Sequence, residues 1–128
     1  MKLLLDTHIW LWALGEPSRL WRRVREEIRK PENEFWLSPV STWEASATER
    51  PGSDSAPAQP GEMARQVHCP LREAPFTNEI VLLAQQLPLP HHDPADRFLA
   101  ATAQVMNLTL VTGDDGLLGL GTFLTLKN

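Results

Sequence analysis

Residues 2–15 read KLLLDTHIWLWALG, and this stretch indicates how the chain folds. Lys2–Leu5 is a short apolar run, typical of a strand buried on both faces, and it leads directly into Asp6. Ile9–Leu14 has the length and apolar character of a short helix, which Gly15 is placed to end. The stretch therefore predicts a buried first strand followed at once by a helix.

The same alternation of short strand-like runs and longer helix-like ones continues along the chain and favours an α/β fold with a mostly parallel sheet. We expect further strands at Glu34–Leu37, Leu71–Ala74, Leu108–Val111 and Thr122–Leu126. We expect helices from Ser18 to about Lys30, from Ser38-Pro39 through Glu44, at Glu62–Val67, from Thr77 to about Leu87, from Pro94 to about Met106 and at Asp115–Leu118. The segment 50–61, RPGSDSAPAQPG, has no aliphatic residue larger than alanine and predicts a flexible loop.

Length and composition exclude several classes of protein. The chain has 128 residues, which is enough for one domain with a buried core. Its net charge of −4 argues against a basic protein that binds nucleic acid through bulk charge. A single cysteine, Cys69, excludes an internal disulfide and a cysteine-based zinc site. No apolar run is long enough for a membrane span or a secretory signal, so we expect a cytoplasmic protein.

Four acidic residues, Asp6, Glu44, Asp96 and Asp114, are the candidate functional residues. Asp6 and Asp114 come just after expected strands, and ligands of open parallel sheets bind outside the carboxyl ends of the strands. Glu44 and Asp96 stand in the first turns of helices that we expect on the same side. Carboxylates that share one site repel each other, and a hard cation relieves that repulsion. The oxygen-only set therefore predicts a site for Mg²⁺, with Mn²⁺ as the alternative.

Each acid also has a purely structural interpretation. Asp6 is placed to cap the first helix. Glu44 stands three residues after Ser41, which is the spacing of a capping box. Asp93 precedes Pro94 as an N-cap would, and Asp96 then gains from the helix dipole. Asp114 and Asp115 have glycines on either side that suit a turn. These interpretations account for each acid singly, but not for all four falling on one edge.

Other residues with chemical potential carry weaker signals. Adjacent histidines at His91 and His92 suit an exposed loop better than a shared metal ion. Arg97 follows Asp96 directly and is placed to contact phosphate or a neighbouring carboxylate. Trp10 and Trp12 cannot share one helix face, so we expect one of them to be at least partly exposed and available to a partner.

The chain resembles the PIN domain, and within it the VapC-type toxins of toxin–antitoxin pairs. The resemblance rests on LLLDTHIWLWAL, SPVSTWEAS, HHDPADRFLAATA and LTLVTGDDGLL, and it covers nearly the whole chain in order. It implies a three-layer α/β/α domain with a parallel sheet of about five strands between helices. It also implies that Asp6, Glu44, Asp96 and Asp114 form the acidic set, with Thr112 as the small hydroxyl residue before the last acid. Asp93 matches an accessory acidic or capping position.

The same resemblance implies a Mg²⁺-dependent endoribonuclease that acts as a toxin, pairs with a VapB-like DNA-binding antitoxin and forms a homodimer. One block departs from the family pattern: after Glu44 the chain reads ASATERPGSDSAPAQPGEMARQ, without the aliphatics of a long amphipathic helix. We therefore expect the helix that carries Glu44 to be short.

Two other functions fit the same residues. Asp6 at a strand end suits the nucleophile of an aspartyl-phosphate phosphotransferase, although His8 stands where such enzymes of the haloacid dehalogenase type carry a second aspartate. A catalytically inactive PIN-like module that binds another protein is the second alternative.

Overall fold

The computed structural model describes residues 1–47, 71–90 and 93–128. The expected loop at 50–61, the expected helix at Glu62–Val67 and the pair His91 and His92 lie outside these residues. The described elements are β1 (Lys2–Leu5), α1 (Thr7–Gly15), the 3₁₀ helix η1 (Pro17–Arg19), α2 (Arg22–Arg29), β2 (Glu34–Leu37), α3 (Pro39–Ala47), β3 (Leu71–Glu73), α5 (Asn78–Gln86), α6 (Pro94–Met106), β4 (Thr109–Thr112), the 3₁₀ helix η2 (Asp115–Leu117) and β5 (Thr125–Lys127).

The five strands form one parallel sheet in the order β3-β2-β1-β4-β5. From β1 the chain builds outward to β2 and β3 on one side, and then returns to place β4 and β5 on the other. Strand order therefore reverses at the β1–β4 pair. In sheets of this kind the reversal leaves a crevice at the carboxyl ends of the two strands.

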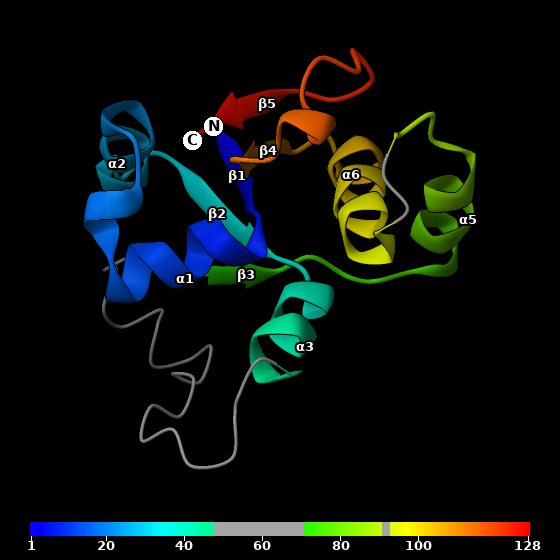
Figure 1. Ribbon diagram of the computed structural model, residues 1–128, viewed down its shortest axis with the longest axis horizontal. Coiled ribbons are helices and arrows are strands. Elements are labelled where there is room, and N and C mark those ends of the chain that lie inside the picture. The colour runs from blue at the N-terminus through cyan, green and yellow to red at the C-terminus, as the bar shows by residue number, and fades with distance from the viewer. Residues whose placement is uncertain (48–70, 91–92) are drawn as a thin grey trace.

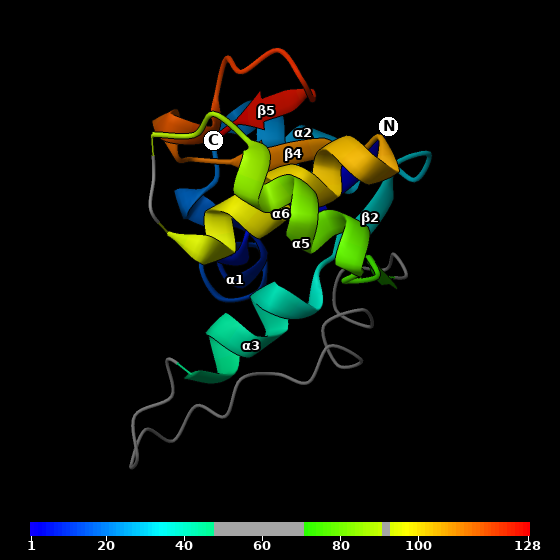
Figure 2. The same cartoon turned by 90° about the vertical axis from the view of Figure 1, so that its right-hand side faces the viewer.

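Helices cover both faces of the sheet, which confirms the expected three layers (Figure 1). Alternate residues of β1 serve the two faces. Leu3 and Leu5 pack with Ile9 and Trp10 of α1 in one core cluster. Leu4 packs with Leu99 of α6 and other residues of α5 and α6 in the second cluster. Figure 2 shows α5 and α6 together over that second face.

The expected helix from Ser18 to Lys30 is wrong, because the structure divides it into η1 and α2. Leu20 and Trp21 have extended backbone between the two pieces, with ψ angles of 136° and 152°. Asn128 holds this break: its side chain accepts from the Trp21 amide at 2.7 Å and donates to the Arg19 carbonyl at 3.3 Å. Hydrogen bonds with Asn128, which lies 107 positions after Trp21 in the sequence, thus replace the helical hydrogen bonds of this segment.

The strands Lys2–Leu5 and Glu34–Leu37 and the helix Pro94–Met106 have the expected bounds, and the other expected elements within the described residues appear with shifted ends. The chain bends at Gly119 and Gly121, which have φ angles of 78° and 77°, and β5 therefore begins later than expected. The helix that carries Glu44 is described over Pro39–Ala47, and its expected shortness stays a prediction because the residues that follow lie outside the described part of the chain. None of the helices in the described part of the chain is long and apolar enough to cross a membrane.

Candidate active site

Asp6 is fixed at the carboxyl end of β1, next to the end of β4. Its amide donates to the carbonyl of Val111 at 3.0 Å, which extends the β1–β4 pairing by one residue. Oδ1 accepts from the amide of Thr7 at 2.7 Å, so Asp6 caps α1 as its structural interpretation predicts. Oδ2 accepts from Oγ1 of Thr112 at 2.7 Å. Burial raises the pKa of this carboxyl, and the Thr112 and Thr7 hydrogen bonds oppose that shift.

Glu44 reaches the same place from α3 through a hydroxyl on α1. Oγ1 of Thr7 lies 2.7 Å from Oε1 of Glu44 and 3.0 Å from Oγ of Ser41. The capping-box interpretation of Glu44 is wrong, because Ser41 is buried inside α3 and faces Thr7. Ser38 serves the helix start instead, where its Oγ accepts from the amide of Val40. Sequence analysis missed Thr7, although it stands between Asp6 and His8 in the DTH motif.

Asp96 sits in the first turn of α6, three residues after Asp93. Asp93 is the N-cap, since its side chain accepts from the amide of Ala95 at 3.0 Å. Burial raises the pKa of Asp96 to about 7, and the nearby charges of Asp93, Asp6 and Asp114 add to the shift. A hydrogen bond with the Asp114 side chain acts in the same direction. The carboxylates are thus close enough to oppose each other's ionisation.

Asp114, and not Asp115, belongs to this group. The amide of Asp114 donates to Oγ1 of Thr112, and its side chain accepts from the amide of Gly116 as the N-cap of η2. Asp115 points away to Lys127, with 3.0 Å between Oδ1 and Nζ, and its side chain is 81% exposed.

The four predicted acids line one cavity of about 360 Å³, at the strand reversal. Its full lining is Asp6, Thr7, His8, Trp12, Glu44, Asp93, Asp96, Gly113 and Asp114. The residue after β1, α3, α6 and the turn after β4 each contribute an acid, so residues 108 positions apart in sequence meet there. Trp12 is half-buried at this cavity and stacks on His8, while Trp10 is buried in the core. One tryptophan of the pair is thus partly exposed, as predicted.

The donor set suits a hard divalent cation, because such ions prefer oxygen ligands and the cavity lining includes the carboxylates of Asp6, Glu44, Asp93, Asp96 and Asp114. The raised pKa of Asp96 is the second sign, since burial raises it and the charges of Asp93, Asp6 and Asp114 raise it further. Across the described ranges, however, no three acidic, histidine or cysteine side chains stand close enough to hold an ion between them as they are. Mg²⁺ retains several waters in such sites, and direct ligation by one or two carboxylates is sufficient.

Arg97 contacts the end of α5, a partner that the sequence did not predict. Its guanidinium donates to backbone carbonyls at the end of α5, the shortest bonds being 2.9 Å to Ala84 and 2.7 Å to Leu87. Longer bonds reach Gln85 and Leu89. A cation at a helix C-terminus is favourable to the helix dipole, and the side chain thereby fastens α6 to α5.

A second, largely apolar groove of about 540 Å³ adjoins the acidic cavity. It lies between α3, the segment before α5 and α6, and its lining includes Val40, Trp43, Phe76 and Phe98. Phe76 and Phe98 meet edge to face with their ring centroids 4.9 Å apart. Glu44 and Asp93 line both cavities, which therefore share a wall.

Several solved structures share the fold. VapBC2 from Rickettsia felis, bound to a DNA fragment from its promoter, superposes with a TM-score of 0.68 at 16% identity, covering 99% of this chain and 98% of the other. DNA-bound VapBC from Salmonella typhimurium gives 0.64 at 14%, with 99% and 98% covered. FitAcB from Neisseria gonorrhoeae gives 0.60 at 19%, with 98% and 96% covered.

Among curated proteins, no sequence matches the chain significantly. A family model for the PIN domain does match, over residues 3–121, and this range contains all four acids of the cavity. The chain therefore belongs to the PIN domain family, a family of nucleases.

Proposed function

We propose that the protein is a Mg²⁺-dependent endoribonuclease that hydrolyses phosphodiester bonds of RNA. One observation carries the proposal: four carboxylates from four separate elements line a single cavity at the strand reversal, and the pKa of Asp96 is raised to about 7 there. A protein gains no stability from repulsion among buried acids, so the arrangement is best explained by a bound cation.

Each acid has a defined part in this proposal. Asp6, Asp96 and Asp114 would hold the metal, and Glu44 would join them directly or through water. When bound, Mg²⁺ (or Mn²⁺) would supply the positive charge that draws phosphate into the cavity, eases deprotonation of an attacking water and offsets charge in the transition state. Thr112 and Thr7 fix the Asp6 and Glu44 oxygens by hydrogen bonds. A fixed position lowers the cost of arranging the carboxylates during the reaction.

The direct test is cleavage of single-stranded RNA by Asp6→Asn, with and without Mg²⁺. We expect the variant to lose cleavage by a factor of about 10² or more while its circular dichroism spectrum and melting temperature stay near those of the wild type. Glu32→Gln is the matched control, because Glu32 is an exposed acid that does not line the cavity. Cleavage by Asp6→Asn at the wild-type rate would exclude the metal-site mechanism.

We further propose that the enzyme is the toxin of a toxin–antitoxin pair, inhibited by a VapB-like DNA-binding antitoxin. The apolar groove that shares Glu44 and Asp93 with the acidic cavity supports this, since it suits a peptide with large apolar side chains followed by an arginine. A similar fold solved in a toxin–antitoxin complex from Klebsiella pneumoniae is consistent with it. Inhibition of cleavage by such a peptide, and not by one with the arginine replaced by glutamate, is the expected result. A homodimer stays a prediction, to be tested by sedimentation.

A catalytically inactive binding module remains the second candidate, favoured by the absence of a ready-made three-ligand cluster in the described residues. Titration with Mg²⁺ or Mn²⁺ helps to separate the two, because a protein that holds the ion in its folded state gains melting temperature with ion concentration, and no response favours the inactive module. For the phosphotransferase alternative, stable uptake of beryllofluoride at Asp6 is the distinguishing result.

A further inference from the structure

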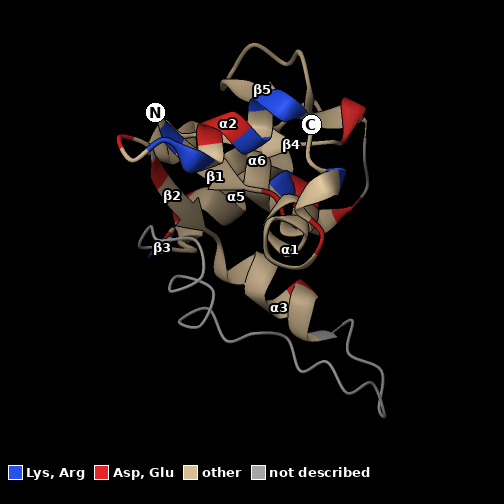
Figure 3. Ribbon diagram, turned by 90° about the vertical axis from the view of Figure 1, so that its left-hand side faces the viewer, with Lys and Arg blue, Asp and Glu red and all other residues tan. Residues whose placement is uncertain are grey.

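Half of the basic residues of this acidic protein lie in one short segment of the chain. Residues 16–30 contain six of the twelve lysines and arginines of the chain and only three acids. Coloured by charge, the ribbon shows Lys and Arg along α2 and at the end of β5 (Figure 3). Local positive charge of this kind can attract a polyanion even though the net charge of the chain is −4.

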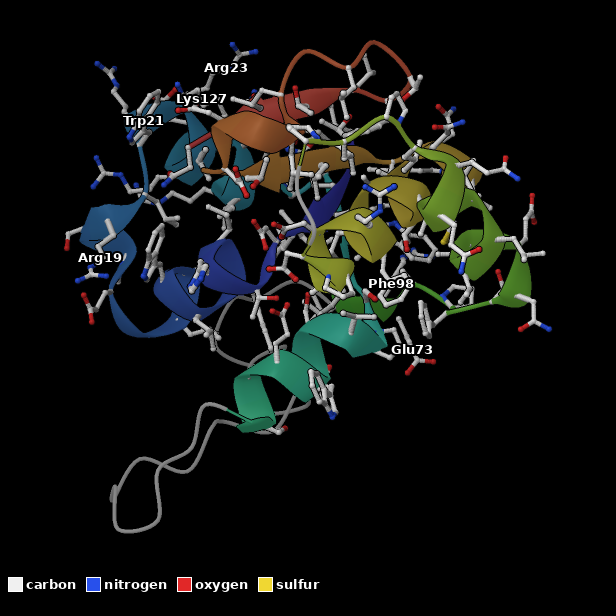
Figure 4. The ribbon with its side chains drawn as sticks, turned by 45° about the vertical axis from the view of Figure 1, so that its right-hand side comes forward. Arg19, Trp21, Arg23, Glu73, Phe98 and Lys127 are labelled. Atoms are coloured by element: carbon white, nitrogen blue, oxygen red, sulfur yellow. The ribbon has the colours of Figure 1, made fainter. Side chains whose placement is uncertain are left out.

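Two tryptophans stand among these cations. Nζ of Lys127 lies 5.5 Å from the ring centroid of Trp21, and Cζ of Arg19 lies 5.5 Å from that of Trp12. Trp21 is 54% exposed, although its neighbour Leu20 is buried. Figure 4 shows Arg19, Trp21, Arg23 and Lys127 along one side of the molecule. Arg19 belongs to η1, Arg23 to α2 and Lys127 to β5, and Trp21 lies between η1 and α2.

This surface connects with the acidic cavity in two ways. Trp12, under the Arg19 guanidinium, lines the cavity itself. Lys127 pairs with Asp115, whose neighbour in sequence, Asp114, lines the cavity as well. Asn128 links this surface to the end of β4. Its amide donates to the Thr112 carbonyl, and its side chain forms hydrogen bonds with the backbone of Arg19 and Trp21.

The existing ion pairs of the surface are easily exchanged. Arg19 pairs with Glu16 while both side chains are more than half exposed, and Lys127 pairs with the still more exposed Asp115. Exposed pairs of this kind contribute little to stability. A phosphate can therefore replace the carboxylate on either cation at small cost.

We propose that Arg19, Trp21, Arg23 and Lys127 form a docking surface for single-stranded RNA that leads to the acidic cavity. This inference rests on the proposed function, and it adds where the substrate binds outside the metal site. The cations would contact successive phosphates, and the exposed face of Trp21 would stack on an unpaired base. Stacking on an aromatic face and backbone charge contacts together are the usual means of binding single strands without sequence preference.

The test uses a fluorescently labelled single-stranded RNA of mixed sequence, bound in EDTA so that it stays intact. We expect the double variant R23A/K127A to bind about tenfold more weakly than the wild type. The slope of log affinity against log salt should also become shallower by about 1.4, since each lost phosphate contact on a single strand accounts for about 0.7. Trp21→Ala should weaken binding by a similar factor, and Trp21→Phe should restore most of it.

Arg72→Ala is the matched control. Arg72 also lies over a tryptophan ring, at 5.7 Å from the centroid of Trp36, and also pairs with an acid, Glu34, but it belongs to β3 at the opposite edge of the sheet. We expect this variant to retain wild-type RNA affinity and salt dependence. An equal loss in Arg72→Ala and the double variant, or no loss in either, would overturn the docking surface.

Cleavage in Mg²⁺ separates this inference from the proposed function. If the wild type cleaves RNA and the double variant has a raised KM with unchanged kcat, the nuclease function and the docking surface are both supported. If the wild type cleaves and the double variant matches it in KM and affinity, the nuclease stands and the docking surface is wrong. If the wild type binds RNA without cleaving it, the nuclease fails, and weaker binding by the double variant still supports the surface. A variant that loses a protein partner while keeping full RNA affinity would assign the surface to that partner instead.

Discussion

The hydroxyl of Thr112 donates a 2.7 Å hydrogen bond to Oδ2 of Asp6, and this bond joins the carboxyl ends of β4 and β1. Both residues are buried, and the Thr112 hydroxyl also accepts from the amide of Asp114 at 3.1 Å. One hydroxyl therefore sets the position of two acids of the cavity. Burial raises the pKa of Asp6, and this bond opposes that rise.

Thr112→Val should lower the activity of the enzyme without unfolding it. The substitution keeps the shape of the side chain but removes the hydrogen bond that opposes the rise in the Asp6 pKa. We expect kcat/KM near neutral pH to fall about tenfold and the acidic limb of its pH profile to move to higher pH. Thr112→Ser retains the hydroxyl and should keep the wild-type profile. An unchanged profile in the valine variant would mean that the bond does not control Asp6.

Thr7→Val should separate Glu44 from the other acids. The 2.7 Å bond from Thr7 to Glu44 ties α3 to α1, so its loss leaves the carboxylate free to turn away. We expect a three- to tenfold loss of RNA cleavage, reflecting the loss of one hydrogen bond to a charged group. Thr7→Ser should recover it. If Glu44→Gln has no effect on cleavage while Thr7→Val does, then Thr7 acts on Asp6 and not through Glu44.

Asp96 should make the metal-free protein less stable as pH rises. Its pKa of about 7 in the folded state lies above the ordinary value of 3.8. Between these two pH values the folded form holds a proton that the unfolded form has released. The stability that this group contributes is thus complete below about pH 4 and is lost between about pH 4 and 7.

Asp96→Asn removes this dependence, because the amide does not titrate. In EDTA at pH 8 we expect the variant to be more stable than the wild type by about 1 kcal/mol, a value discounted for the partial exposure of the side chain. Urea unfolding at pH 5 and pH 8 measures the difference. A wild-type protein whose free energy of unfolding is equal at the two pH values would contradict the raised pKa.

Arg97→Ala should destabilise the fold rather than the active site. The guanidinium holds carbonyls at the end of α5, and its removal leaves them without that donor. We expect a loss of about 2–3 kcal/mol in the free energy of unfolding, with only part recovered by Arg97→Lys because an ammonium cannot span the same carbonyls. Arg29→Ala is the control, an exposed arginine in the last turn of α2 that should change stability by less than about 0.5 kcal/mol.

The sequence by itself determined the order of the elements, the α/β class and the four acids of the cavity. These features are local: apolar runs mark the buried strands, and Asp93-Pro94 and Thr77 mark helix starts that the structure retains. Asp6 and Asp114 were found because they directly follow strands, and parallel strands bring their carboxyl ends to one edge.

Only the tertiary structure decided which residues meet. Asn128 divides the helix expected after Ser18, Thr7 binds Glu44, and Arg97 binds a carbonyl at the end of α5. Each of these is a hydrogen bond between residues at least 10 positions apart, and local periodicity carries no information about such pairs. The pKa of Asp96 is likewise a property of the assembled cavity, because it depends on burial and on acids that only the fold brings beside it.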